Sequence, residues 1–102
     1  MNIPQNVKVA GKDYAVICEE KTLALDGKQL YGRVDYDNQE ICIDSSLQKE
    51  DGQKETVIHE VLHAIARDRE INFGDADEEL LINQFAKGLY QVIKDNPNIF
   101  SK

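Results

Sequence analysis

The residues in this chain best suited to chemistry are His59, Glu60 and His63, in the sequence His-Glu-Val-Leu-His. Residues 54–69 around them carry apolar residues at intervals of three and four and contain neither Gly nor Pro, so we expect a helix. Helical positions four apart lie only about 40° apart around the axis, which stacks the two imidazoles one turn apart. The histidines can then bind one metal ion, while Glu60, about 100° from His59, can act as a base beside it.

Two histidines four residues apart also occur on solvated helix faces without a metal. In this chain both histidines belong to the motif, Glu follows the first of them, and apolar residues lie on both sides of the pair. These features favour a metal site over a degenerate or purely structural pair.

A third ligand is needed, because a catalytic zinc usually has three protein ligands and one open position. The chain has no third His, so this ligand must be a carboxylate or a Cys. Glu78 and Glu79 open the second expected helix, where acidic residues are also common for their effect on the helix dipole. We predict Glu79, because Asn83 lies four residues later on the same face and can hydrogen-bond a ligand histidine. Glu78 remains the alternative, since helix phase is uncertain near an N-terminus.

The surrounding elements predict an α+β fold. The pattern indicates two hairpins, over residues 5–10 with 13–20 and 30–36 with 39–44, and two helices, over residues 54–69 and 77–95. We therefore expect a single domain over residues 1–102, with a small antiparallel sheet of two hairpins followed by two long helices packed on one face.

The connections between these elements carry the usual breaking and capping residues. Residues 21–29 contain Asp26-Gly27 and are interpreted as a loop. Gly52 is expected to separate the main helix from a short helical turn that Ser45 or Ser46 caps. Asp75 or Asp77 can cap the second helix, which should end at Asn96-Pro97.

Composition narrows the classes of function. The chain has 102 residues, of which 41% are hydrophobic and 30% charged, as in an ordinary globular domain. Its net charge is −7 and its basic residues are scattered, which argues against binding nucleic acid. No apolar run approaches the length of a membrane span, and the N-terminus lacks the pattern of a signal peptide, so we expect a cytoplasmic protein without a membrane partner.

The two cysteines, Cys18 and Cys42, fall in apolar runs that are typical of strands. In a reducing compartment they are expected to be small buried thiols. Metal ligation by one of them is the less favoured alternative, because they are not spaced as a Cys-x-x-Cys pair.

The metal motif continues into the second helix as Glu79-Leu-Leu-Ile-Asn83-Gln-Phe-Ala86. Together the two segments resemble the zinc site of thermolysin-like gluzincins and, more narrowly, that of ImmA/IrrE-type metallopeptidases, whose second motif runs Glu-x-x-Ala-Asn/Asp-x-Phe-Ala. The ending Lys87-Gly-Leu-Tyr-Gln-Val-Ile-Lys-Asp-Asn-Pro97 is similar to that of short phage and prophage proteins of Gram-positive bacteria. The resemblance implies a zincin-like fold, zinc ligands at His59, His63 and Glu79, a general base at Glu60, and an orienting role for Asn83.

The predicted activity is zinc-dependent hydrolysis of a peptide bond in a protein or peptide substrate. An extended substrate could add to the sheet edge at residues 30–36 or 39–44. Tyr31, Tyr36 or Tyr90 could donate a hydrogen bond to the developing oxyanion. The alternative is an inactive zincin-like protein that binds a phage or host protein through its acidic surface.

Overall fold

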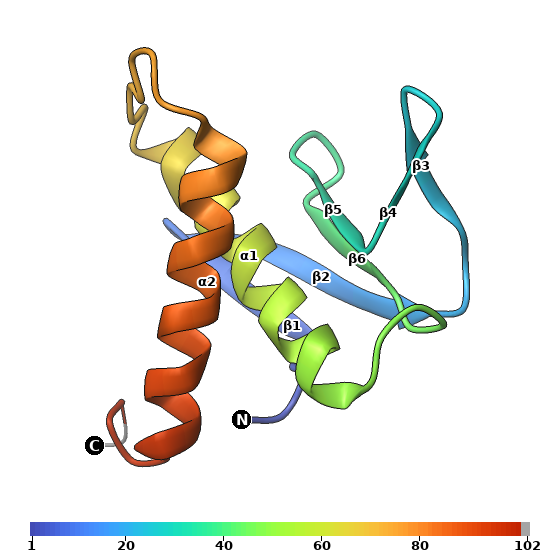
Figure 1. The fold of residues 1–102 in the computed structure, drawn as a ribbon, viewed down its shortest axis with the longest axis vertical. Coiled ribbons are helices and arrows are strands. Elements are labelled where there is room, and N and C mark those ends of the chain that lie inside the picture. Colours follow the sequence, from blue (N-terminus) through green and yellow to red (C-terminus); the bar gives the residue numbers. More distant parts are fainter. Residues whose placement is uncertain (101–102) are drawn as a thin grey trace.

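A computed structural model of the protein describes residues 1–100, which form strands followed by two long helices (Figure 1). The α+β class is confirmed. The elements are β1 (Asn6–Val9), β2 (Lys12–Glu19), β3 (Leu23–Leu25), β4 (Lys28–Leu30), β5 (Gly32–Asp35), β6 (Glu40–Asp44), α1 (Glu50–Asp68) and α2 (Glu78–Asp95).

Four strands form the main sheet in the order β1-β2-β6-β5. Both predicted hairpins are present, because β1 pairs antiparallel with β2 and β5 pairs antiparallel with β6. The sheet is nevertheless mixed, since β2 and β6 are parallel. The second hairpin joins β2 through its second strand, and this arrangement makes β6 parallel to β2 and leaves β5 at the edge.

The segment predicted as a loop at residues 21–29 contains an additional strand and the start of another. β3 and β4 pair as a separate two-stranded sheet. Asp26 and Gly27 both have positive φ, at 52° and 76°, as a two-residue hairpin turn requires. The loop interpretation was wrong because Asp26-Gly27 was taken only as a break, although this dipeptide also favours a tight turn between paired strands.

The main helix starts earlier than expected, at Glu50, so Gly52 lies in its first turn and separates nothing. A Cβ on residue 52 would lie 2.9–3.1 Å from side-chain atoms of Gln48, so glycine leaves room for that side chain. Ser46 caps no helix, because its backbone N–H and its hydroxyl both donate to the Asp44 carboxylate.

The larger core lies between the sheet and α1. Ile41 and Ile43 of β6 are fully buried, and they pack in one cluster with Val57 and Ala64 of α1. α1 therefore packs directly on the sheet.

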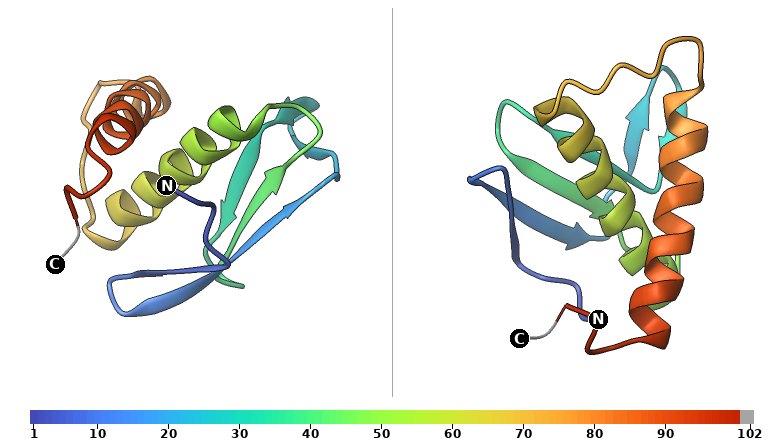
Figure 2. Two further views of the ribbon diagram at one scale, coloured as in Figure 1. Left: turned by 90° about the horizontal axis from the view of Figure 1, so that it is seen from below. Right: turned by 90° about the vertical axis from the view of Figure 1, so that its left-hand side faces the viewer.

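The second helix packs on α1 and not on the strands, so α1 lies between α2 and the sheet (Figure 2). Their contact is a separate small cluster around Ile58, Ala86 and Tyr90. The expectation that both helices lie directly on one face of the sheet therefore applies to α1 alone.

The predicted limits of α2 agree with the structure. Of the two candidate caps, Asp77 is the one used, and its carboxylate accepts the Leu80 N–H at 3.1 Å. The helix ends at Asp95, directly before Asn96-Pro97. Within residues 1–100, neither helix combines the length and the apolar character needed to cross a membrane.

The prediction of two buried thiols was wrong for Cys18, which is exposed, and Cys42 is only half-buried. Cys18 lies near the end of β2, where its thiol contacts Gln53 Oε1 of α1 at 3.3 Å. Both cysteines are free.

Candidate metal centre

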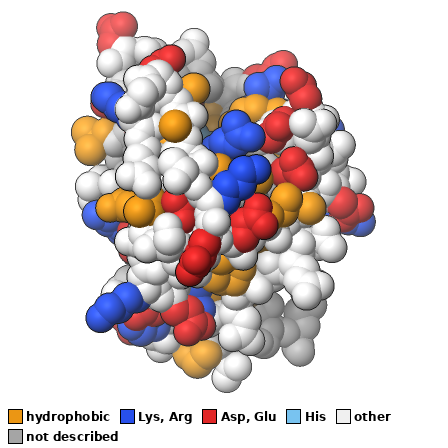
Figure 3. Space-filling model, turned by 90° about the vertical axis from the view of Figure 1, so that its right-hand side faces the viewer, with side chains coloured by type: hydrophobic (Ala, Val, Ile, Leu, Met, Phe, Trp, Pro, Cys, Tyr) orange, Lys and Arg blue, Asp and Glu red, His pale blue; other side chains and the backbone are white. Residues whose placement is uncertain are grey.

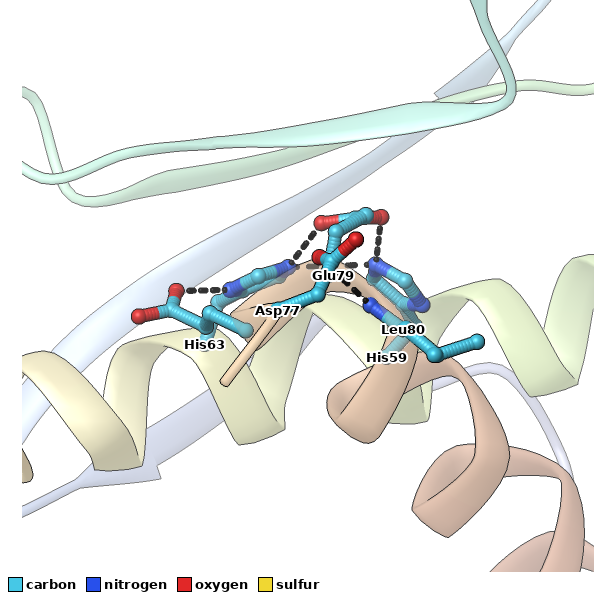
Figure 4. Close-up of polar contacts among 6 residues, drawn as sticks. His59, His63, Asp77, Glu79 and Leu80 are labelled. Carbon is cyan, nitrogen blue, oxygen red and sulfur yellow. Dashed lines mark hydrogen bonds and ion pairs between the residues drawn. The ribbon is translucent and has the colours of Figure 1, made fainter. Parts of the chain in front are cut away.

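The two helices bring three predicted ligands together. α1 presents His59 and His63, and the first turn of α2 presents Glu79 (Figure 4). The two oxygens of Glu79 lie 2.7 Å from His59 Nε2 and 2.8 Å from His63 Nε2, and the two imidazole nitrogens are 3.1 Å apart. This group of side chains could hold a metal ion.

The two ring nitrogens of His63 each face a carboxylate oxygen. His63 Nδ1 faces the Glu78 carboxylate at 2.9 Å, and in the neutral tautomer that donates to this carboxylate the lone pair is on Nε2. That lone pair points toward Glu79, a second acceptor, and toward His59 Nε2. Two acceptors at such short range need either a proton or a metal ion between them.

Glu78, the alternative ligand, has a different position. Its carboxylate lies 2.9 Å from His63 Nδ1, on the far side of the ring from Glu79. A carboxylate at this place fixes the tautomer that leaves Nε2 available for a metal. The sequence favoured Glu79 and left Glu78 as the alternative, and the structure places the two carboxylates on opposite sides of the His63 ring.

Asn83 lies in the same cavity as His59, as its position one turn after Glu79 suggested. Burial lowers the pKa of His59, and this effect outweighs the opposing influence of the Glu79 charge and of a hydrogen bond with Asn83. A lowered pKa favours the neutral imidazole, which is the form that binds metals.

Glu60 directly follows His59 on α1, so its side chain leaves the helix about 100° around the axis from that of His59. Its side chain is only 5% exposed and opens onto the cavity that holds the histidines. Burial raises its pKa to about 7, against the attraction of His63. A carboxyl group with a pKa near neutrality is suited to accept and release a proton.

The cavity beside the ligand group has a volume of about 760 Å³. One wall is α1 and α2, and the other is β5 with the β3–β4 hairpin, which supplies Leu25 and Gln29. The sequence did not predict that the β3–β4 hairpin forms this wall of the cavity. The turn-forming pair Asp26-Gly27 was the signal that could have indicated the hairpin. At Gly32 the sheet comes so close to α1 that a Cβ would lie 2.7 Å from Thr56 Cγ2.

The three candidate tyrosines divide by position. Tyr31 and Tyr36 line the cavity, whereas the Tyr90 hydroxyl donates to Asp51 at 2.5 Å between the helices. The Tyr36 ring lies under the Arg67 guanidinium at 4.1 Å. Burial, followed by the nearby Glu60 charge, raises the pKa of Tyr36, so its hydroxyl stays protonated and able to donate.

Charges are mixed on the strand side of the molecule. Figure 3 shows basic and acidic side chains interspersed there, without a broad basic area. This face offers no basic stripe of the kind that follows a nucleic-acid backbone.

A comparison with protein families, curated proteins and solved structures finds no match to this chain.

Proposed function

We propose that the protein is a zinc-dependent peptidase of the zincin type. The observation that carries this proposal is the meeting of His59, His63 and Glu79 beside one cavity into which Glu60 also opens. The resemblance of the His-Glu-Val-Leu-His segment to gluzincins supports the same activity.

The donor set suits zinc among common metals. Two neutral imidazoles and one carboxylate match the protein ligands of many catalytic zinc sites, and calcium or magnesium would favour oxygen ligands alone. When bound, zinc supplies Lewis acidity that makes water more acidic and polarises a peptide carbonyl. Glu78 and Asn83 would orient the ligand imidazoles from outside the group.

Glu60 is the proposed general base. It lies one residue after His59 on α1 and is largely removed from solvent. Its carboxylate would take a proton from the attacking water and pass it to the leaving amine. Tyr36 and Tyr31 are the candidate donors to the oxyanion, since both face the cavity.

The edge strand β5 supports a peptide as the substrate. The Asp44 N–H donates to the Tyr31 carbonyl at 2.9 Å, so the alternation of an antiparallel pair points the backbone groups of Gly32 and Val34 away from β6. An extended peptide can pair with these groups alongside the cavity. Of the two strands expected to serve, β6 is internal to the sheet, which leaves β5.

Cleavage of a mixed peptide library tests the activity directly. We expect zinc-loaded protein to cleave peptides, a chelator to abolish cleavage, and Glu60→Gln to reduce it about 100-fold or more. Glu50→Gln is the matched control, because it removes an exposed carboxylate from the same helix. Cleavage that persists in Glu60→Gln would reject the mechanism, and zinc binding without any cleavage would favour the alternative of a non-catalytic binding protein.

A further inference from the structure

A second apolar row runs along α2, away from the face that contacts α1. Leu81, Phe85 and Val92 are 36%, 69% and 42% exposed. At 100° per residue they lie roughly 120° around the axis from the contact face formed by Ile82 and Ala86. α2 lies at the outer side of the molecule with α1 beside it (Figure 2), and the three apolar side chains of the row are exposed.

Gly88 belongs to the same row and leaves a notch in it. The spacing Leu81, Phe85, Gly88, Val92 alternates four and three residues, as in the seam between two packed helices. Glycine inside a helix is less stable than alanine by about 1 kcal/mol. Nothing lies within 4 Å of a Cβ built at Gly88, so packing inside this molecule does not require a glycine there.

Charges limit what can cover the row. The row has no charged member, and acidic residues stand at its two ends, about 25 Å apart along the axis. They are Glu78, which also contacts His63, and Asp95, which also accepts a hydrogen bond from Gln91. A second copy of this chain would bring like charges together, and each copy has a net charge of −7. A basic segment is complementary at both ends.

We propose that Leu81, Phe85, Gly88 and Val92 form a docking surface for an amphipathic helix of another protein. That helix has an apolar seam, with one large side chain for the notch at Gly88, and Lys or Arg near both of its ends. Apolar anchors at intervals of three and four residues are the usual way in which such a helix is recognised. One end of this surface adjoins the metal centre, because Glu78 also contacts His63, but the proposal does not depend on the proposed peptidase activity.

The test uses two synthetic labelled helices of about 20 residues, a length that spans the row. Both have the same leucine seam, and the ends carry Lys in one and Glu in the other. Fluorescence anisotropy against the metal-free protein should show binding of the Lys-ended helix that is about tenfold or more tighter than that of the Glu-ended helix. Added salt should reduce the difference.

Variants then locate the site. Phe85→Asp should weaken binding of the Lys-ended helix about tenfold or more. Leu80→Asp is the matched control, because Leu80 is also exposed on α2, at 55%, but lies outside the row, and it should retain binding within about twofold. Equal losses in both variants, or no binding by the wild type, would overturn the proposal. So would sedimentation showing that the protein itself dimerises through Phe85, since a second copy would then occupy the row.

Discussion

The two sides of α1 are held by different forces. On the sheet side, Ile41 and Ile43 are fully buried in a continuous apolar cluster with Val57. On the α2 side, the apolar cluster is small, and polar groups act at both ends: the histidines with Glu79 at one end, and Asp51 with Tyr90 at the other. The sheet therefore fixes α1, whereas the position of Glu79 depends on polar contacts that a metal would reinforce.

Deleting side chains on each side of α1 should show this contrast most strongly. Ile41→Ala should reduce the free energy of unfolding by about 3–4 kcal/mol, because it leaves a cavity at a residue with no exposure. Leu89→Ala, at a half-buried position on the α2 side, should lose about 1 kcal/mol. Urea denaturation measures both. Equal losses would mean that the two interfaces are equivalent.

Comparison of the wild type with Glu60→Gln tests whether burying the Glu60 carboxyl group lowers the free energy of unfolding at high pH. Its pKa rises from 4.5 to about 7 on folding, so the folded state holds the proton more tightly. The resulting stabilisation is complete below pH 4.5 and is lost as the pH rises through about 7. By pH 8, metal-free wild type should have lost about 3 kcal/mol relative to Glu60→Gln.

The measurement for Glu60 is urea denaturation of both proteins at several pH values. Other titrating groups are common to the two proteins, so the difference between them isolates residue 60. A difference that does not change with pH would show that this carboxyl group is not shifted.

A substitution at Gly32, where β5 lies close to α1, should cause a smaller loss of stability than Ile41→Ala. Gly32→Ala places a Cβ 2.7 Å from Thr56 Cγ2 and should destabilise the protein by about 2 kcal/mol. Thr56→Ser removes that methyl group but keeps the hydroxyl that donates to the Gly52 carbonyl, so it should restore part of the loss. Thermal melts of the single and double variants check this. Simple additivity would contradict a steric cause.

Removal of the hydrogen bond between Tyr90 of α2 and Asp51 of α1 should cause the smallest loss of stability. Tyr90→Phe removes the hydrogen bond that chiefly lowers the pKa of Asp51. The stabilisation by this hydrogen bond is present above the pKa of the Asp51 carboxyl in the unfolded state and is lost as the pH falls through its lower pKa in the folded state.

In Tyr90→Phe at neutral pH, amide hydrogen exchange should become faster in α2 and hardly change in α1, which the sheet holds in place. Equal acceleration in both helices would show that they open as one unit.

The sequence predicted most of what depends on local periodicity. The limits of α2, both hairpins around the sheet and the stacking of His59 on His63 follow from spacing and from turn residues. The parallel pairing of β2 with β6 could not be predicted from the sequence, because it depends on how one hairpin packs beside the other. The preference for Glu79 as the ligand came from the spacing to Asn83, but the contact of Glu78 with His63 Nδ1 depends on the angle between the two helices, which the sequence does not define.

We propose that side chains of two helices hold one metal ion and leave one of its positions open. Elemental analysis of purified protein, dialysed against zinc and then buffer, measures whether the ion is bound. We predict one zinc per chain in the wild type, loss of the metal in His63→Ala and Glu79→Ala, and retention with weaker affinity in Glu78→Ala. Absence of zinc from the wild type, or a Glu79→Ala protein that keeps it while Glu78→Ala does not, would show that these three side chains are not the metal ligands.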